Sequence, residues 1–361
     1  MSHEESLKLD DVNMIKRLDQ SGMYSYLCSI SEDSLKSYRK AKFIFTFPSN
    51  KIKNIVGAGM GGSGMTPIAI GSMFKDELTV PYVLSQDYDL PKFVNSDTLL
   101  IAISDSGETE EVISQYYEAR KRKAKIIIIG QRSKLIEIAK NDNIPYFDYS
   151  TPVPSRASFA FMFGSTLACL ENIGVIRNNI ETELLESITI VNSLKNEIGV
   201  NIKTEKNIAK KVALLIKTRT PILYIEPPFE SLGPRSAKNL NENAQMLAFY
   251  NYLPEIRHNE MMGWVSTSNS KLKYIPILLR ENKKYSKMER EIDEIKKLLN
   301  SDVIEFRAFG ESKIARFYSL LYIMDMIAYY EAILINKDPS DTTHLKQLKS
   351  KLRSLSIIPY S

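Results

Sequence analysis

The chain has 361 residues, of which 43% are hydrophobic and 25% charged, which is enough for two ordinary domains with sizeable cores. Its formal net charge of +5 at pH 7, from 48 basic and 43 acidic side chains, is too small an excess to indicate a nucleic-acid-binding surface. The two cysteines are far apart, the N-terminus lacks a signal-peptide core, and no uninterrupted apolar segment reaches membrane-spanning length, so we expect a cytoplasmic protein with no membrane partner.

The first half of the chain predicts alternating strands and helices. Leu, Ile, Met and aromatic residues recur at helical intervals over 10–47, which predicts one or two leading helices. Strands are predicted at Ile52–Val56, Val80–Leu84, Leu99–Ile103, Ile126–Ile129 and Pro145–Asp148. Helices are predicted between them, notably at Glu110–Lys123 and Lys134–Lys140. The unbroken isoleucine run at 126–129 is typical of a strand covered on both faces, as in a parallel sheet.

The second half repeats this layout. Helical periodicity covers 183–217, and a strand is predicted at Ile222–Ile225. The loop Phe229–Pro234 then leads into a helix through Asn239–Leu247. Two further strands are predicted at Tyr274–Leu279 and Val303–Phe306, with an amphipathic helix over 292–299 between them. A long apolar helix is predicted at Ile314–Leu334.

These elements predict an α/β protein made of two nucleotide-fold-like domains, each a mainly parallel sheet flanked by helices. We place an N-terminal helical leader at 1–47 and the first domain at 48–178. The second domain, with the C-terminal helices, takes up 179–361.

Two loops rich in glycine and serine each follow a predicted strand. They are Gly57–Gly64 (GAGMGGSG) and Ser104–Thr109 (SDSGET). Glycine lets the backbone approach an anion closely, and helix N-termini offer N–H groups with a partial positive charge. Hydroxyl donors are added by Ser63, Ser104, Ser106 and Thr109. Two such loops on neighbouring parallel strands converge on one phosphate, so the sequence predicts a phosphorylated small molecule as the ligand.

The first loop also fits a dinucleotide-binding fingerprint. Gly57, Gly59 and Gly62 have the required spacing, and Asp87 follows the next predicted strand, where a ribose-binding acid could lie. The second loop favours a monophosphate site, because a dinucleotide fold does not require a Ser-x-Ser-Gly-x-Thr turn after a later strand. Either loop alone is also explained as a tight strand-to-helix turn with capping hydroxyls.

Two further residues bring acid–base chemistry. Glu242 lies between two asparagines on a predicted helix, and His258 lies in a polar segment shortly before the sole tryptophan, Trp264. Each has a simpler explanation, as a surface helix carboxylate and as a capped loop histidine. The asparagines near both residues indicate an organised polar pocket, which favours the functional interpretation.

Taken in order, these segments resemble the bifunctional phosphoglucose/phosphomannose isomerases, which are built from two sugar-isomerase (SIS) domains. The matching segments are Gly59–Gly64, Ser104–Thr109, Pro152–Ala157, Asn241–Ala244, Pro254–Glu260 with Gly263 and Trp264, Gly310–Arg316, and Asp338 with Pro339. Nearly all of the chain after residue 50 is covered. Each glycine loop is moderately specific, whereas the ordered set through Asn-Glu-Asn and His-Asn-Glu is much more specific.

The resemblance implies two groups of site residues. The sugar phosphate would be held by Gly62, Ser63, Ser104, Ser106 and Thr109. At the reacting carbons, Glu242 would be the base that moves a proton between C1 and C2, and Arg156 would stabilise the enediolate. His258 would assist ring opening from the opposite subunit of a homodimer.

The C-terminal part of the match supplies two more residues. Lys349, with Lys346 as the rival match, would contact the sugar ring, and Thr342 would stand beside the reacting carbons. Asp105 and Glu108 depart from the family pattern, which more often has uncharged residues there. Their carboxylates would oppose a phosphate unless they face away from it.

The implied activity is reversible aldose–ketose isomerisation of glucose 6-phosphate and mannose 6-phosphate with fructose 6-phosphate through a cis-enediol(ate). It requires no cofactor, and three histidines with two separated cysteines form no convincing metal constellation. The alternatives are a non-catalytic sugar-phosphate sensor and, with less support, a dinucleotide-dependent oxidoreductase. A sensor of this fold usually carries a DNA-binding domain, for which the segment before Ile52 is short.

Overall fold

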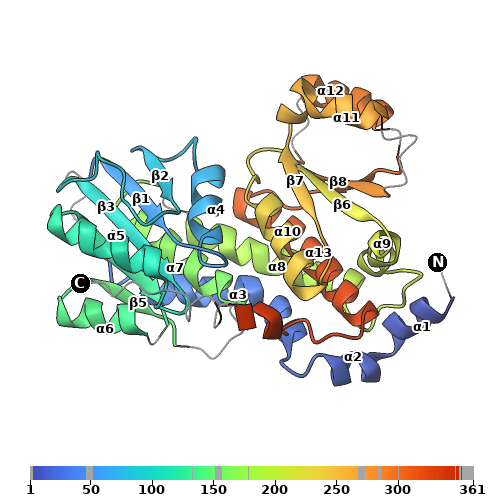
Figure 1. The fold of residues 1–361 in the computed structure, drawn as a ribbon, viewed down its shortest axis with the longest axis horizontal. Coiled ribbons are helices and arrows are strands. Elements are labelled where there is room, and N and C mark those ends of the chain that lie inside the picture. The colour runs from blue at the N-terminus through green and yellow to red at the C-terminus, as the bar shows by residue number, and fades with distance from the viewer. Residues whose placement is uncertain are drawn as a thin grey trace.

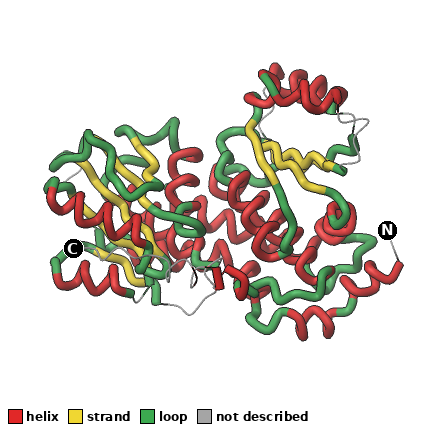
Figure 2. The backbone as a smooth tube through the Cα atoms, viewed as in Figure 1, coloured by secondary structure: helices red, strands yellow, loops and turns green. Residues whose placement is uncertain are grey.

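The protein is built around two parallel β-sheets with helices packed around and between them (Figure 1). The computed structural model describes residues 3–45, 52–131, 133–150, 157–177, 179–266, 273–282, 286–299, 301–345, 347–348 and 351. Figure 2 shows the two sheets standing apart, with helices filling the space between them. The predicted α/β class is confirmed, while the boundary at residue 179 stays a prediction.

The first sheet has the strand order β2-β1-β3-β4-β5, and all its neighbours are parallel. Its strands are β1 (Asn54–Ala58), β2 (Tyr82–Ser85), β3 (Thr98–Ser104), β4 (Lys125–Gly130) and β5 (Tyr146–Asp148). The five strands predicted in this half are therefore confirmed, with boundaries shifted by a few residues. The direction of winding reverses between β1 and β3, which is where open α/β sheets bind ligands, at the carboxyl ends of the strands.

Alternation along the strands gives this sheet two buried faces. Even-numbered residues of β3 and β4, such as Leu100 and Ile128, pack with α5 (Glu110–Lys121) and α6 (Lys134–Asn141). Odd-numbered residues such as Ile101 and Ile127 face α4 (Met65–Met73) and α7 (Phe159–Asn172). Because both faces are covered, every residue of β3 is buried and its sequence is almost continuously apolar.

The second sheet repeats the same winding with four parallel strands in the order β7-β6-β8-β9. Its strands are β6 (Thr220–Ile225), β7 (Phe249–Tyr252), β8 (Tyr274–Arg280) and β9 (Ile304–Arg307). The elements around it are α8 (Ile180–Ile198), α9 (Ile208–Ile216), α10 (Leu232–Asn243), η2 (Glu255–His258), α11 (Glu260–Ser266), α12 (Ser286–Leu298) and α13 (Lys313–Leu334).

Two elements of the second half differ from the prediction. No strand was expected at β7, because this edge strand is exposed or half-buried and lacks an apolar run. Helix α10 begins at Leu232 and ends at Asn243, so Gly233 and Pro234 belong to its first turn rather than to a loop. Proline is tolerated there because the first N–H groups of a helix have no intrahelical acceptor. The helix cannot continue through Gln245, which has a positive φ of 49°.

Helix α13 forms the centre of the molecule. It is long and apolar enough to cross a membrane, but its most apolar window is 100% buried inside the protein, as in a core helix. Its apolar side chains belong to one cluster that also includes residues of both sheets and of the leading helices. Tyr and Phe make up much of its surface, so it packs against neighbours on every side.

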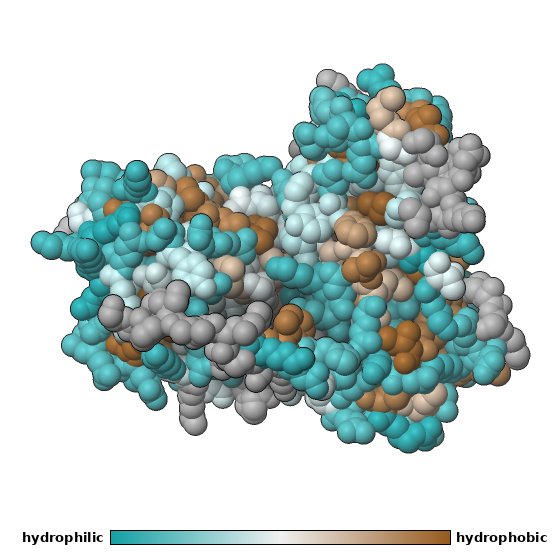
Figure 3. All heavy atoms as spheres, viewed as in Figure 1, coloured by the Kyte–Doolittle hydropathy of each residue, from teal (hydrophilic) through white to brown (hydrophobic). Residues whose placement is uncertain are grey.

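The described part of the leading segment contains three helices, of which two lie within 10–47, where one or two were predicted. The three helices are α1 (His3–Asp10), α2 (Val12–Leu18) and α3 (Met23–Ala41). Helix α3 packs on α7, where the Ser34 hydroxyl donates to the Ala160 carbonyl at 2.9 Å. Helix α1 contacts the second half, since Lys8 Nζ donates to the Leu334 carbonyl at 2.6 Å. The leader is therefore packed into both halves. Figure 3 shows that the visible face outside this core is mostly hydrophilic.

Candidate active site

The two glycine loops lie side by side at the carboxyl ends of β1 and β3. These strands are direct neighbours, with Ala58 opposite Ala102. The backbone N–H of Asp105, in the second loop, donates to the hydroxyl oxygen of Ser63, in the first loop, at 3.0 Å. The predicted convergence of the loops is therefore present, and it occurs at the point where the winding of the sheet reverses.

The hydroxyl groups of these loops are arranged as donors. Backbone N–H groups occupy an acceptor position on each of three serines: Asp105 N–H on Ser63, Gly107 N–H on Ser104 (3.0 Å) and Glu108 N–H on Ser106 (3.3 Å). The Thr109 and Ser104 hydroxyls lie 2.9 Å apart, so one of them donates to the other. With acceptor positions filled by the backbone, the remaining hydroxyl hydrogens can point to an anion.

Glycine is required at two places in these loops. Gly61 and Gly107 have φ values of 54° and 61°, in the left-handed region that side chains disfavour. A Cβ at Gly107 would also collide with the Ser133 side chain. The close turn of the second loop onto the N-terminus of α6 thus depends on the absence of a side chain.

The acidic residue Asp105 is turned away from the loop hydroxyls into a separate contact. Its Oδ1 accepts hydrogen bonds from Gln131 Nε2 at 2.7 Å and from the Tyr149 hydroxyl at 2.5 Å. Burial, together with the neighbouring Asp105 carboxylate, raises the pKa of Tyr149, which keeps this hydroxyl neutral and donating. Asp105, one of the two residues that depart from the family pattern, therefore has partners of its own. Glu108, the other, is exposed.

Glu242 comes to these loops from the second half of the chain. It lies on the last turn of α10 and is half-buried. One turn earlier, Lys238 Nζ donates to the Gly61 carbonyl at 3.2 Å and contacts Met65 Sδ at 3.9 Å. Burial lowers the pKa of Lys238, and the Glu242 carboxylate acts in the opposite direction. Helix α10 therefore brings the Lys238 ammonium to the first loop and carries the Glu242 carboxylate one turn further along.

A buried carboxylate on α13 fixes the orientation of α10. Asp325 accepts from Arg235 Nη2 at 2.8 Å and from Asn239 Nδ2 at 2.6 Å, so it holds two successive turns of the helix. The guanidinium of Arg235 also lies over the Phe159 ring, 4.6 Å from its centroid. Arg235 and Asp325 are 6% and 1% exposed, which makes this a well-shielded ion pair.

The corresponding position in the second sheet holds charged side chains rather than a glycine loop. Glu226 follows β6 and Arg280 ends β8, and Arg280 Nε donates to Glu226 Oε2 at 3.3 Å. Arg280 is fully buried and also donates to Glu289 and Glu305, each at 3.0 Å. Among the residues that the structure describes, the loops suited to a phosphate are therefore those of the first sheet.

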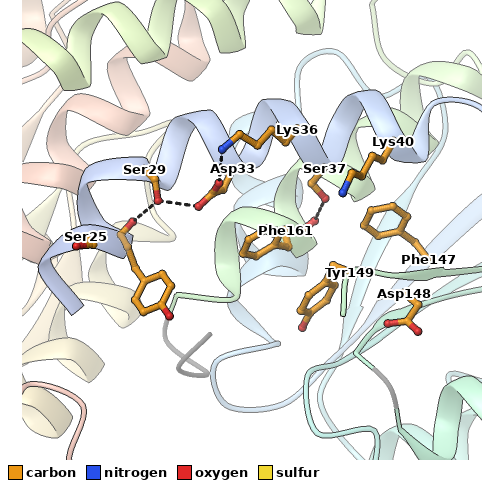
Figure 4. Close-up of a pocket in the computed structure, with 11 residues that line it drawn as sticks. Ser25, Ser29, Asp33, Lys36, Ser37, Lys40, Phe147, Asp148, Tyr149 and Phe161 are labelled. Carbon is orange, nitrogen blue, oxygen red and sulfur yellow. Dashed lines mark hydrogen bonds and ion pairs between the residues drawn. The ribbon is translucent and has the colours of Figure 1, made fainter. Parts of the chain in front are cut away.

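A cavity of about 520 Å³ lies elsewhere, between α3 and the end of β5 (Figure 4). Its wall includes Lys36 and Lys40 of α3, with Phe147, Asp148 and Tyr149 on the opposite side. None of its lining residues belongs to the two glycine loops. Among the described lining residues, Tyr149 reaches the candidate site, where its hydroxyl donates to Asp105.

Comparisons with known proteins give the family. The chain is 30% identical over 309 residues to a bifunctional phosphoglucose/phosphomannose isomerase of Aquifex aeolicus, with 83% of this chain and 91% of the relative covered. The chain belongs to the bifunctional phosphoglucose/phosphomannose isomerase family. A Caldicellulosiruptor bescii protein with the same description is 28% identical over 338 residues, covering 92% of this chain and 99% of that protein.

Two further findings agree with this family. Residues 205–352 match the model of the bacterial phospho-glucose isomerase C-terminal SIS domain. A crystal structure of a hypothetical protein from Thermus thermophilus has the same fold, with a TM-score of 0.72 and 14% identity, and the match covers 97% of this chain and 94% of that one. The strand order 2-1-3-4-5 also differs from the order 3-2-1-4-5-6 of dinucleotide-binding folds, which counts against the oxidoreductase alternative.

The other site residues that the family resemblance implies are either outside the described residues or have no described contact with the two glycine loops. Arg156, Lys346 and Lys349 lie outside the described residues. His258 is exposed in η2, where its Nε2 accepts from Arg257 Nε at 3.4 Å. Thr342 follows a segment that is tied to the turn between α2 and α3, because the Ser21 hydroxyl donates to Asp338 at 3.0 Å. The roles of these five residues stay predictions, as do those of Glu242 and of the two glycine loops.

Lys238 and Asp325 were not singled out from the sequence. Lys238 lies four residues before Glu242 on the same helix, and this i, i+4 spacing was a usable signal. Asp325 is an acidic residue in an otherwise apolar helix, and a buried charge of that kind needs a partner. Neither signal identifies the residues that Lys238 and Asp325 contact. These contacts are seen in the packing of α10 on α13 and on the first loop.

Proposed function

We propose that this chain interconverts glucose 6-phosphate and mannose 6-phosphate with fructose 6-phosphate. The observation that carries the proposal is the family membership, because the similarity to a bifunctional isomerase extends over 92% of this chain. The Ser63–Asp105 hydrogen bond supports it, since it joins two loops of neutral donors at the ligand-binding edge of the sheet. Such a site suits the phosphate of a sugar phosphate.

The proposed chemistry transfers one proton between adjacent carbons of the open-chain sugar. Glu242 removes the C2 proton of the aldose, and the electron pair moves onto the carbonyl oxygen to give the cis-enediolate. The same carboxylate returns the proton to C1, while the C2 hydroxyl proton moves to O1 and leaves the C2 carbonyl of fructose 6-phosphate. Arg156 is assigned to the developing oxyanion. The phosphate, held far from the bond changes, keeps C1 and C2 in position.

The position of α10 supports the role of Glu242. Lys238, one turn away, contacts the carbonyl of Gly61 in the first loop, so the helix end that carries Glu242 lies beside the proposed phosphate site. A six-carbon sugar phosphate must reach from the loop hydroxyls to a base, and α10 is the element that comes from the other sheet to that edge. This arrangement suits a base at one end and an anchor at the other.

We assign the active unit to a homodimer in which His258 acts on the site of the partner subunit. His258 is exposed and flanked by large exposed apolar side chains on and beside β7 and α11: Leu247, Phe249, Met262 and Val265. Met262 and Leu247 are 78% and 71% exposed. Apolar side chains beside an edge strand favour association with another chain, here a second copy.

Product identification tests the reaction itself. The purified protein is incubated with fructose 6-phosphate, without nicotinamide cofactor in the isomerisation step, and both aldose 6-phosphates are resolved. We expect glucose 6-phosphate and mannose 6-phosphate to form. Glucose 6-phosphate alone would remove the dual specificity, and binding without either product would favour the sensor.

Subunit complementation tests the place of His258. Glu242→Gln and His258→Ala are each expected to be inactive, and the two proteins are then mixed under conditions that exchange subunits. With sites shared across a two-fold dimer, one of the two sites in each heterodimer is intact, so about a quarter of wild-type activity returns. Should the mixture stay inactive although native mass spectrometry shows heterodimers, His258 acts within its own subunit or not at all.

A further inference from the structure

Lys238 occupies an unusual position between the two groups that the reaction needs. It lies on α10 one turn before Glu242, and its ammonium donates to the Gly61 carbonyl at 3.2 Å. Gly61 is two residues from Ser63, which binds the second loop through Asp105 N–H. The ammonium group is therefore at the first glycine loop, on the side that faces Glu242.

The glycine loops themselves carry no positive charge. Their described ligand groups are the backbone N–H groups and the hydroxyls of Ser63, Ser104, Ser106 and Thr109, all of which are neutral. A phosphate monoester carries a charge of about −1.5 to −2 at pH 7. Glu108 adds an exposed negative charge to the second loop, whereas the Asp105 carboxylate is engaged by Gln131 and Tyr149. A cation beside the loops would offset both contributions.

The surroundings of Lys238 suit that task. Its described acceptors are a backbone carbonyl and, at 3.9 Å, the sulfur of Met65, and neither carries a full negative charge. Burial lowers the pKa of Lys238, which shows that the group is partly withdrawn from water. The hydrogen bond from the ammonium to the Gly61 carbonyl has a charged donor but a neutral acceptor. Exchange of this carbonyl for a phosphate oxygen adds the attraction between opposite charges.

We propose that Lys238 is a substrate-binding residue that supplies the positive charge of the phosphate site. In the free protein its ammonium rests on the Gly61 carbonyl, and with a sugar phosphate bound it donates to a phosphate oxygen. The inference rests on the proposed function for the identity of the sugar, but the anion site that it describes does not depend on turnover. Lys238 then connects α10, which carries the proposed base Glu242, to the phosphate group of the substrate.

Two measurements on Lys238→Met test the proposal. Binding of inorganic phosphate is followed by calorimetric titration, and kcat and KM are measured with fructose 6-phosphate. We expect phosphate affinity to fall and KM to rise by about 10- to 100-fold, the range of one hydrogen bond to a charged group, while kcat changes much less. Lys238→Arg, which keeps the charge, is expected to remain within about threefold of wild type in both values.

Lys75→Met is the matched control. Lys75 also joins the two halves, through an ion pair with Glu230 at 2.9 Å at the opposite end of α10, and its side chain is 54% exposed. Its phosphate affinity and KM should equal those of wild type. Thermal unfolding of all variants shows whether they are folded. Should Lys238→Met fail to fold, the comparison of Lys238→Gln with Lys238→Arg provides the same contrast of charge.

The outcomes separate this inference from the proposed function. Unchanged phosphate affinity and unchanged KM in a folded Lys238→Met protein would overturn the role of Lys238, whatever the wild-type activity. Equal losses in Lys238→Met and Lys238→Arg would do the same, because they would assign the effect to packing. If the wild type binds phosphate but does not convert fructose 6-phosphate, the proposed function fails, and weaker phosphate binding by Lys238→Met still supports the charged site.

Discussion

The backbone N–H of Asp105 donates to the Ser63 hydroxyl at 3.0 Å, and this one hydrogen bond joins the two loops that the candidate site requires. Ser63 is 7% exposed, so the bond is shielded from water. Because the Ser63 oxygen accepts the hydrogen bond from Asp105, the hydrogen of this hydroxyl can be donated to another group. Ser63 thus combines a structural role with the ligand-binding role that we propose for it.

Ser63→Ala is expected to lower both stability and phosphate affinity. The buried N–H of Asp105 loses its partner, which costs about 1–3 kcal/mol in the free energy of unfolding. Denaturant unfolding and titration with inorganic phosphate measure the two effects. Ser72→Ala, on the same side of the sheet in α4, is the control and should change stability by less than about 0.5 kcal/mol. Equal stability of both variants would contradict the bridging role of Ser63.

Asp105→Asn is expected to leave phosphate binding nearly unchanged. An asparagine oxygen can still accept from Gln131 and Tyr149, and the carboxylate it replaces is directed to those groups. Asp105→Ala removes the acceptor and should lower the free energy of unfolding by about 1–3 kcal/mol, because the buried Tyr149 hydroxyl loses the carboxylate to which it donates. A tenfold gain in phosphate affinity for Asp105→Asn would instead place the carboxylate against the phosphate.

Glu242→Gln is expected to reduce kcat by about 10²–10⁴-fold, the usual contribution of general acid–base catalysis. The change keeps the size and half-buried position of the side chain, so KM for fructose 6-phosphate and the unfolding transition should stay close to wild type. Steady-state kinetics with product detection provide the measurement. A variant with full kcat would remove Glu242 from the role of base.

The sequence predicts the convergence of the two glycine loops well, because these loops are built from local signals. Glycines, hydroxyls and the strands before them are contiguous, and parallel pairing of β1 with β3 then brings Ser63 to Asp105. Strand β7 was missed because an edge strand has little burial and so no apolar pattern. The start of α10 was missed because Gly233 and Pro234 suggest a loop unless the first helical turn is considered.

Contacts between segments far apart in the chain could not be predicted in the same way. Lys238 with Gly61, and Asp325 with Arg235, join residues 177 and 90 positions apart in the chain. Such pairs depend on how α10 packs against α4 and α13. No local pattern encodes that packing, although the charge of Asp325 within an apolar helix does indicate that this residue has a partner.

Asp325→Ala is expected to be strongly destabilising. It leaves the buried guanidinium of Arg235 without its carboxylate and removes the acceptor of Asn239. Breaking a buried ion pair by removing one partner costs about 3–5 kcal/mol. Asp302→Ala is the matched control, since Asp302 pairs with Arg219 at 3.2 Å but is 81% exposed. Its loss should be below about 1 kcal/mol, and urea unfolding of the two variants should show that difference.

Glu331 on α13 is expected to make stability depend on pH. It is fully buried, and within the described residues neither carboxylate oxygen has a hydrogen-bond partner. Burial raises the pKa of Glu331 from 4.5 to about 8, with Lys217 acting in the opposite direction. Between these values the unfolded chain ionises while the folded protein keeps its proton. The free energy of unfolding therefore falls as the pH rises from about 4.5 to about 8, and this contribution levels off above that range.

Glu331→Gln removes the titrating group and keeps its shape. The variant and wild type should have similar stability near pH 4.5, and the advantage of the variant should grow to about 5 kcal/mol at pH 9. Urea unfolding across this pH range measures the difference. Glu183→Gln serves for comparison: Glu183 is also buried but is paired with Arg177, so its neutralisation should lower stability instead. A constant difference between Glu331→Gln and wild type at all pH values would mean that Glu331 ionises normally in the folded protein.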